Sequence, residues 1–75
     1  MASYIVVANA DMKSVTVYDA RGFQQGKIYL TNGTICGTPT VSGDRVSIPF
    51  ADGSYRYMVQ YSLPQLTYIT QIPLS

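Results

Sequence analysis

The side chains able to do chemistry in this 75-residue chain are few and poorly suited to catalysis. Cys36 is the single cysteine, and the sequence contains no histidine and no glutamate. A serine, threonine or cysteine nucleophile needs a base beside it, and histidine or glutamate usually supplies that base. Cys36 lies in a short apolar segment, where we expect a buried and unreactive thiol. The sequence therefore predicts no catalytic residues.

The four acidic residues are all aspartates, and their spacing does not favour a shared site. Asp11 and Asp19 bracket one predicted strand, and Asp44 and Asp52 bracket another. A six-residue strand holds its ends roughly 20 Å apart, which is too far for an acid–base pair. Calcium needs several oxygen ligands in one loop, and zinc needs histidine or further cysteines. We expect no metal site and no cofactor, and we interpret the aspartates as turn residues.

Tyrosine is the residue type whose placement suggests a functional surface. Of the seven tyrosines, Tyr55, Tyr57 and Tyr61 alternate along one face of a predicted strand. Arg56 lies among them in sequence, and Tyr68 lies on the next predicted strand. Such a row can stack sugars or single-stranded bases, form a protein interface, or pack as core. The five residues are therefore candidate interface or ligand-stacking residues, and all three alternatives stay open.

The elements that must position these tyrosines are strands. Apolar residues alternate along the chain instead of recurring at helical spacing, and Val, Ile, Thr and Tyr dominate the runs. The clearest predicted strands are Tyr4–Ala8, Ser14–Asp19, Lys27–Thr31, Ser54–Tyr61 and Leu66–Ile72. We expect about seven short antiparallel strands in a single all-β domain over residues 1–75, built as a small sandwich or barrel.

Turn residues set the predicted pairing. Asn32-Gly33 is the strongest hairpin signal, so Thr34–Cys36 is expected to pair back on the strand before it. Gly43-Asp44 and Asp52-Gly53 predict two further tight turns. Pro49 and Pro73 cannot donate ladder hydrogen bonds, which places them at sheet edges or strand ends.

The two halves of the chain are loosely similar when Ile5 is aligned with Ile48 and Tyr18 with Tyr61. The length of this repeat falls in the roughly 40–45-residue range of a four-stranded propeller blade. A third candidate architecture is therefore one to two propeller-like blades.

The segment Gly37–Val46, followed by Asp52-Gly53 and the tyrosine-rich strand, resembles one blade of the quinoprotein-type propeller repeat. Ser14–Asp19 is similar to the third strand of such a blade, whereas the tryptophan that often closes these repeats is absent. A complete propeller needs about four to eight blades. The resemblance implies that several copies assemble into a ring, or that the blade packs on another protein.

Size and charge point to a protein that works through contacts with other proteins. A chain this short buries only roughly 60% of its unfolded surface, and without a disulfide or a metal it gains most from self-association. Only 12% of the residues are charged and the net charge is +1, so we expect no binding to duplex nucleic acid or to a membrane. No signal-peptide pattern is present, which predicts cytoplasmic synthesis.

These features together predict a non-enzymatic structural or assembly protein that self-associates, as subunits of larger particles do, for example the virion components of phages. The alternative is a small carbohydrate-binding, lectin-like module that uses the tyrosine face.

Overall fold

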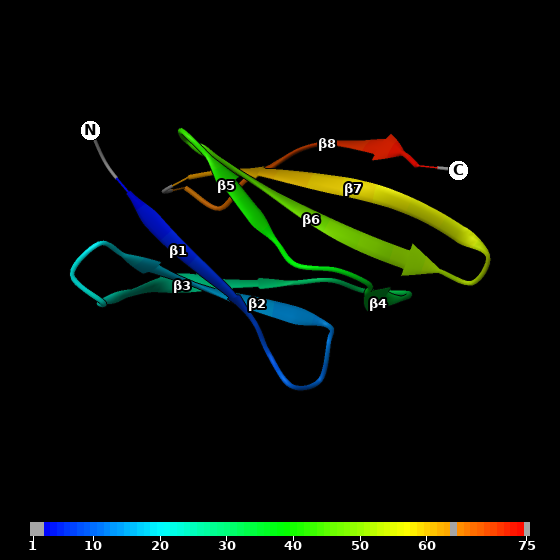
Figure 1. The fold of residues 1–75 in the computed structure, drawn as a ribbon, viewed down its shortest axis with the longest axis horizontal. Coiled ribbons are helices and arrows are strands. Elements are labelled where there is room, and N and C mark those ends of the chain that lie inside the picture. Colours follow the sequence, from blue (N-terminus) through cyan, green and yellow to red (C-terminus); the bar gives the residue numbers. More distant parts are fainter. Residues whose placement is uncertain (1–2, 64, 75) are drawn as a thin grey trace.

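The computed structural model describes residues 3–63 and 65–74, and in these ranges the chain forms eight strands and no helix (Figure 1). One antiparallel sheet contains three consecutive strands: β1 (Tyr4–Ala8), β2 (Ser14–Asp19) and β3 (Gln24–Tyr29). The other contains β4 (Thr34–Ile35), β5 (Thr40–Ser42), β6 (Arg45–Asp52), β7 (Tyr55–Ser62) and β8 (Tyr68–Pro73). The prediction of an all-β fold of short antiparallel strands is confirmed.

The two sheets pack their apolar faces against each other, as in a small sandwich. Alternation along β6 turns Val46, Ile48 and Phe50 to the inside, where they are at most 2% exposed. Val15 and Val17 of β2 are fully buried from the opposite sheet. The remaining core residues are Ile28, Leu30, Ile35, Val59 and Leu63. One hydrophobic core therefore holds the sheets together.

Turns join the strands largely as the sequence predicts. Gly43 and Gly53 have φ angles of 61° and 63°, which glycine adopts without strain, and they lie between β5 and β6 and between β6 and β7. Asp19 caps the turn after β2, because its carboxylate accepts hydrogen bonds from the N–H groups of Arg21 and Phe23 at 2.9 and 3.0 Å. The bond from Phe23, aided by both the backbone and the guanidinium of Arg21, lowers the pKa of Asp19 against an opposing desolvation effect.

The predicted hairpin at Asn32-Gly33 is wrong. Asn32 does adopt a positive φ of 66°, but the chain then crosses to the other sheet, where Ile35 pairs with Phe50. A Cβ at Gly33 would collide with the carbonyl of Ala51 and with the ring of Phe50. Glycine is therefore needed here for a close approach between segments distant in sequence. The third strand also begins earlier than predicted, at Gln24, and it contains a bulge at Gln25 opposite Val17 and Tyr18 of β2.

Pro49 is a second departure from the predicted layout, since it lies in β6, which has partners on both sides. β5 pairs with Arg45–Ser47 and β4 with Phe50 and Ala51, so Pro49 lies in the gap between these two short partners. Its carbonyl accepts the N–H of Cys36 at 2.9 Å. Pro49 has no N–H with which to return this bond, so the β4–β6 ladder ends beside it. Pro73 ends β8, as predicted.

The strands β5, β6, β7 and β8 follow one another as an antiparallel meander, which is the order of strands within a propeller blade. Within residues 3–63 and 65–74 the two sheets do not close into a ring. Assembly of several copies into a ring stays a prediction of the resemblance.

Candidate functional site

The predicted tyrosine face of β7 exists, but it runs from the core out to the solvent. Tyr57 and Tyr61 are half-buried on either side of the buried Val59, and Tyr55 at the hairpin end is 72% exposed. Arg56 lies on the opposite face of the strand by alternation. The five candidate residues therefore do not form one continuous surface.

The inner part of this face is packed. The rings of Tyr61 and Tyr68 lie 5.9 Å apart, edge to face, and the ring of Tyr57 lies 5.6 Å from that of Phe50. Desolvation, with a smaller contribution from Tyr68, raises the pKa of Tyr61. Only a shallow hollow of about 140 Å³ remains between these rings and residues 29–31 at the end of β3. Tyr61 and Tyr68 thus serve mainly as cross-strand packing.

The outer part of the face forms a pocket of about 280 Å³ at the end of the β6–β7 hairpin. It is lined by Asp52, Tyr55, Arg56, Tyr57, Gln71 and Pro73. Three of the five candidate residues, Tyr55, Arg56 and Tyr57, therefore meet in one site. Asp52 lies opposite Tyr55 in the β6–β7 register, and Pro73 lies opposite Tyr57 in the β7–β8 register.

The polar side chains of this pocket are not committed to other contacts. Among the described residues, Asp52, Arg56 and Gln71 take part in no side-chain hydrogen bond or ion pair, whereas Asp11 and Asp19 each accept backbone N–H groups in their turns. Asp52 was interpreted from sequence as a turn residue only. Desolvation and the nearby Asp52 carboxylate, with Tyr68, raise the pKa of Tyr57, so its phenol is neutral at pH 7.

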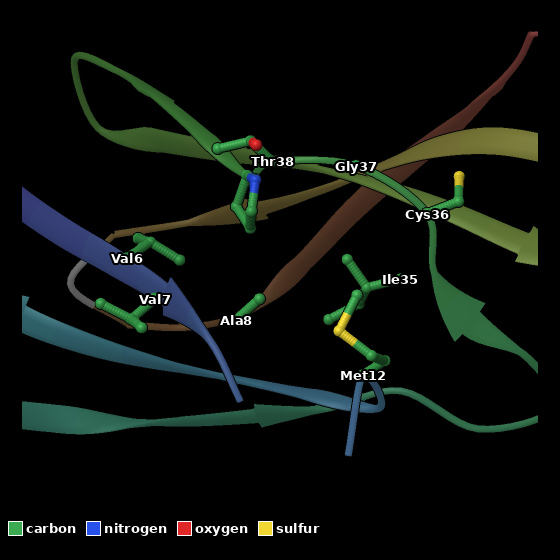
Figure 2. Close-up of a pocket in the computed structure, with 9 residues that line it drawn as sticks. Val6, Val7, Ala8, Met12, Ile35, Cys36, Gly37 and Thr38 are labelled. Carbon is green, nitrogen blue, oxygen red and sulfur yellow. The ribbon is translucent and has the colours of Figure 1, made fainter. Parts of the chain in front are cut away.

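A second feature lies on the open side of the sandwich, beside β1. A groove of about 510 Å³ runs between β1 and the segment that connects β4 to β5. Figure 2 shows Val6, Val7 and Ala8 of β1 along one side and Gly37 and Thr38 along the other. Met12 and Ile35 close one end of the groove, where the Ile35 N–H donates to the Met12 carbonyl.

The outer edge of β1 carries unpaired backbone groups. Asn9 donates its N–H to the carbonyl of Ser14 at 2.9 Å, which fixes the alternation of the β1–β2 ladder. The N–H and C=O groups of Tyr4, Val6 and Ala8 therefore point away from β2. The described residues place no other strand in hydrogen-bonded register with β1.

The edge of β1 is also unguarded, meaning that no charge, proline or bulge protects it, although β5 lies near it without pairing with it. Its five residues, Tyr4–Ala8, include no charge and no proline, and Ile5 and Val7 are 52% and 46% exposed. The other long edge strands carry the usual protection, which is Lys27 on β3, Pro73 on β8, and a bulge within each strand, at Gln25 and Ile69. The edges of β4 and β5 are only two and three residues long.

Cys36 is exposed, so the prediction of a buried thiol is wrong. Ile35 takes the inward position in β4, and the next side chain must point outward (Figure 2). Over the described ranges, no three Cys or Asp side chains gather as a metal site, and no helix is long and apolar enough to cross a membrane.

Sequence reasoning missed Asp52, Gln71 and Pro73 as pocket residues. It predicted the strand Tyr4–Ala8 but did not identify the edge of that strand as a candidate site. The uncharged run Tyr4–Ala8 was a signal for an edge, but edge positions cannot be read before the strand order is known. No family model, no curated protein and no solved structure matches the chain.

Proposed function

We propose that the protein is a non-enzymatic structural subunit that self-associates by pairing the β1 edge of one copy with the β1 edge of another. The unguarded edge of β1 carries this proposal. Free N–H and C=O groups on an edge strand are a template for another strand, and proteins that stay apart block such edges with lysine, proline or bulges. Of the long edge strands in the described structure, β1 alone lacks these devices.

Two-fold symmetry gives this pairing a definite register. In an antiparallel pair centred on Val6, that residue faces Val6 of the second copy, and Tyr4 faces Ala8 of the second copy. The outward backbone groups of these three positions then form about six hydrogen bonds, two for each narrow pair. Ile5 lies opposite Val7 of the second copy, which gathers the four exposed β-branched side chains into one patch.

The inward side chains are complementary in size. Tyr4, Val6 and Ala8 point toward the sandwich interior and are only half-buried. Ala8 also lines the groove beside β1, with Met12 and Ile35. In the symmetric register the large Tyr4 of the second copy comes to lie over the small Ala8, next to this groove. The Tyr4 ring of a second copy would therefore occupy part of the groove beside Ala8 of the first copy.

The size of the contact sets its expected strength. Stable interfaces use about 20–30 residues a side, whereas β1 supplies five residues and the groove a few more. We therefore expect weak, concentration-dependent association that is strengthened where many copies are held together, as in a particle such as a virion. Charge does not oppose this pairing, because β1 carries none.

Sedimentation velocity tests the proposal. The wild-type mass should rise from the monomer value of 8.2 kDa toward twice that value as the concentration increases. Val7→Lys puts a charge on the edge and should weaken association at least tenfold. The matched control is Ile72→Lys, because Val7 and Ile72 are equally exposed at 46% and Ile72 lies on β8.

Three results would contradict the proposal: a wild-type protein that stays monomeric at millimolar concentration, equal association of wild type and Val7→Lys, or equal loss in the two lysine variants. Circular dichroism must show the same strand content in all three proteins.

A further inference from the structure

The β6–β7 hairpin presents part of its inner face to solvent. Along β6 and β7 the inward positions pass from the buried Phe50 through the half-buried Tyr57 to the exposed Tyr55. Figure 1 shows the hairpin end on the right, away from β1. An aromatic side chain exposed on the inner face of a sandwich has no packing role there, which makes this end a candidate for ligand contact.

The apolar part of the pocket is a small platform. Tyr55 and Tyr57 are two residues apart on one strand face, so their Cα atoms lie roughly 7 Å apart. Pro73 lies beside Tyr57 in register, and the Phe50 ring supports Tyr57 at 5.6 Å. In this platform the ring of Tyr57 is therefore supported by packing, whereas the exposed ring of Tyr55 is able to move over a ligand.

The polar part of the pocket surrounds this platform. Asp52 supplies acceptors, and the amide of Gln71 both donates and accepts, whereas the Arg56 side chain lies on the opposite face of β7. Neither Asp52 nor Gln71 forms a side-chain hydrogen bond or an ion pair in the described residues, so their hydrogen-bonding capacity is available to a ligand. The negative charge of Asp52 disfavours a phosphate or a carboxylate as the ligand.

We propose that this hairpin pocket, formed by Asp52, Tyr55, Arg56, Tyr57, Gln71 and Pro73, binds a neutral pyranose sugar. The C–H face of a pyranose packs on a tyrosine ring, while its ring of hydroxyls both donates and accepts hydrogen bonds. The volume of about 280 Å³ lies just below the roughly 300–1,000 Å³ of drug-sized ligand sites, which suits a single sugar residue. Nucleic acid fits less well, because Asp52 would face the phosphates.

Titration of the full chain with methyl glycosides of glucose, galactose, mannose and N-acetylglucosamine tests the site, with backbone amide NMR shifts as the readout. At least one glycoside should give saturable shifts centred on Asp52, Tyr55 and Gln71. Tyr55→Ala and Asp52→Asn should each weaken that binding at least tenfold. Tyr29→Ala is the matched control, because Tyr29 is 70% exposed but lies on β3.

The proposal is overturned if none of these glycosides gives saturable shifts at millimolar concentration. It is also overturned if Tyr29→Ala weakens binding as much as Tyr55→Ala, or if a thymidine oligonucleotide shifts the pocket and the glycosides do not. The monomeric Val7→Lys variant should bind the glycoside with wild-type affinity. Failure of sugar binding therefore leaves the self-association proposal standing, and the reverse also holds.

Discussion

The β1 edge and the β6–β7 hairpin end both present side chains to solvent, yet they offer different chemistry. β1 presents backbone N–H and C=O groups between aliphatic side chains and carries no charge. The hairpin end presents two tyrosines with uncommitted aspartate, arginine and glutamine side chains. A surface whose polar groups are backbone accepts another backbone, whereas one whose polar groups are side chains suits a small polar ligand. In so small a domain, exposure alone does not identify a binding surface; the kind of polar group does.

The largest expected effect comes from removing the ring beneath the hairpin end. Phe50→Ala should lower the free energy of unfolding by about 3–5 kcal/mol, because Phe50 is 2% exposed and packs against Tyr57. Urea denaturation measures the change, and Phe23→Ala, at a 63% exposed position, should have little effect.

Hydrogen exchange on Phe50→Ala then separates the two regions. Amides of β6 and β7 should lose more protection than amides of β1 and β2, because Phe50 lies on β6 and packs against Tyr57 of β7. An equal loss of amide protection in both regions would mean that the two sheets unfold together as one unit.

The next effect tests the register at the β1 edge. With Cys36 replaced by Ser, a mixture of Ile5→Cys and Val7→Cys chains should form a disulfide-linked heterodimer under mild oxidation. In the symmetric pair these positions are directly opposite, with Cα atoms about 4.5 Å apart. Either variant alone should cross-link poorly, because its own positions are diagonal neighbours about 7–8 Å apart. Mass spectrometry identifies the products, and efficient self-linking of Ile5→Cys would rule out this register.

The smallest effect is the ionisation of Tyr57. Because desolvation and Asp52 raise its pKa, Tyr57 stabilises the folded state fully below the unfolded-state pKa of about 10. That contribution is lost as the pH rises through the higher folded-state pKa. Ultraviolet absorbance should show two late-titrating phenols, Tyr57 and Tyr61. One of them should disappear in Tyr57→Phe and should titrate earlier in Asp52→Asn. An unchanged curve in Asp52→Asn would mean that the carboxylate does not face the ring.

Local alternation was enough to predict much of the fold. A strand was predicted between Asp44 and Asp52, and Val46, Ile48 and Phe50 share its buried face because side chains on a strand repeat every two residues. The turns at Gly43 and Gly53 were recognised because glycine tolerates their positive φ. Both signals lie within a few residues of the feature that they predict.

Features that depend on distant segments were not predictable in this way. Gly33 reads as a hairpin residue, and its real role depends on Ala51 and Phe50, which the fold brings against it. The tyrosine face reads as one row, and it is divided because the core covers Val59 but leaves Tyr55 exposed. Asp52 becomes a pocket residue because Gln71 and Pro73 of β8 line the same pocket, and this pairing of β8 with β7 is distant in sequence from Asp52.

The hairpin end lies away from β1 in Figure 1, so joining copies through β1 leaves their hairpin pockets uncovered. Each proposed pair would then carry two identical sites, and a larger assembly would carry many. A sugar-coated surface would meet these sites together, and release would require several of them to open at once. A millimolar affinity at one pocket would then suffice for firm attachment through avidity, with no change in the pocket itself.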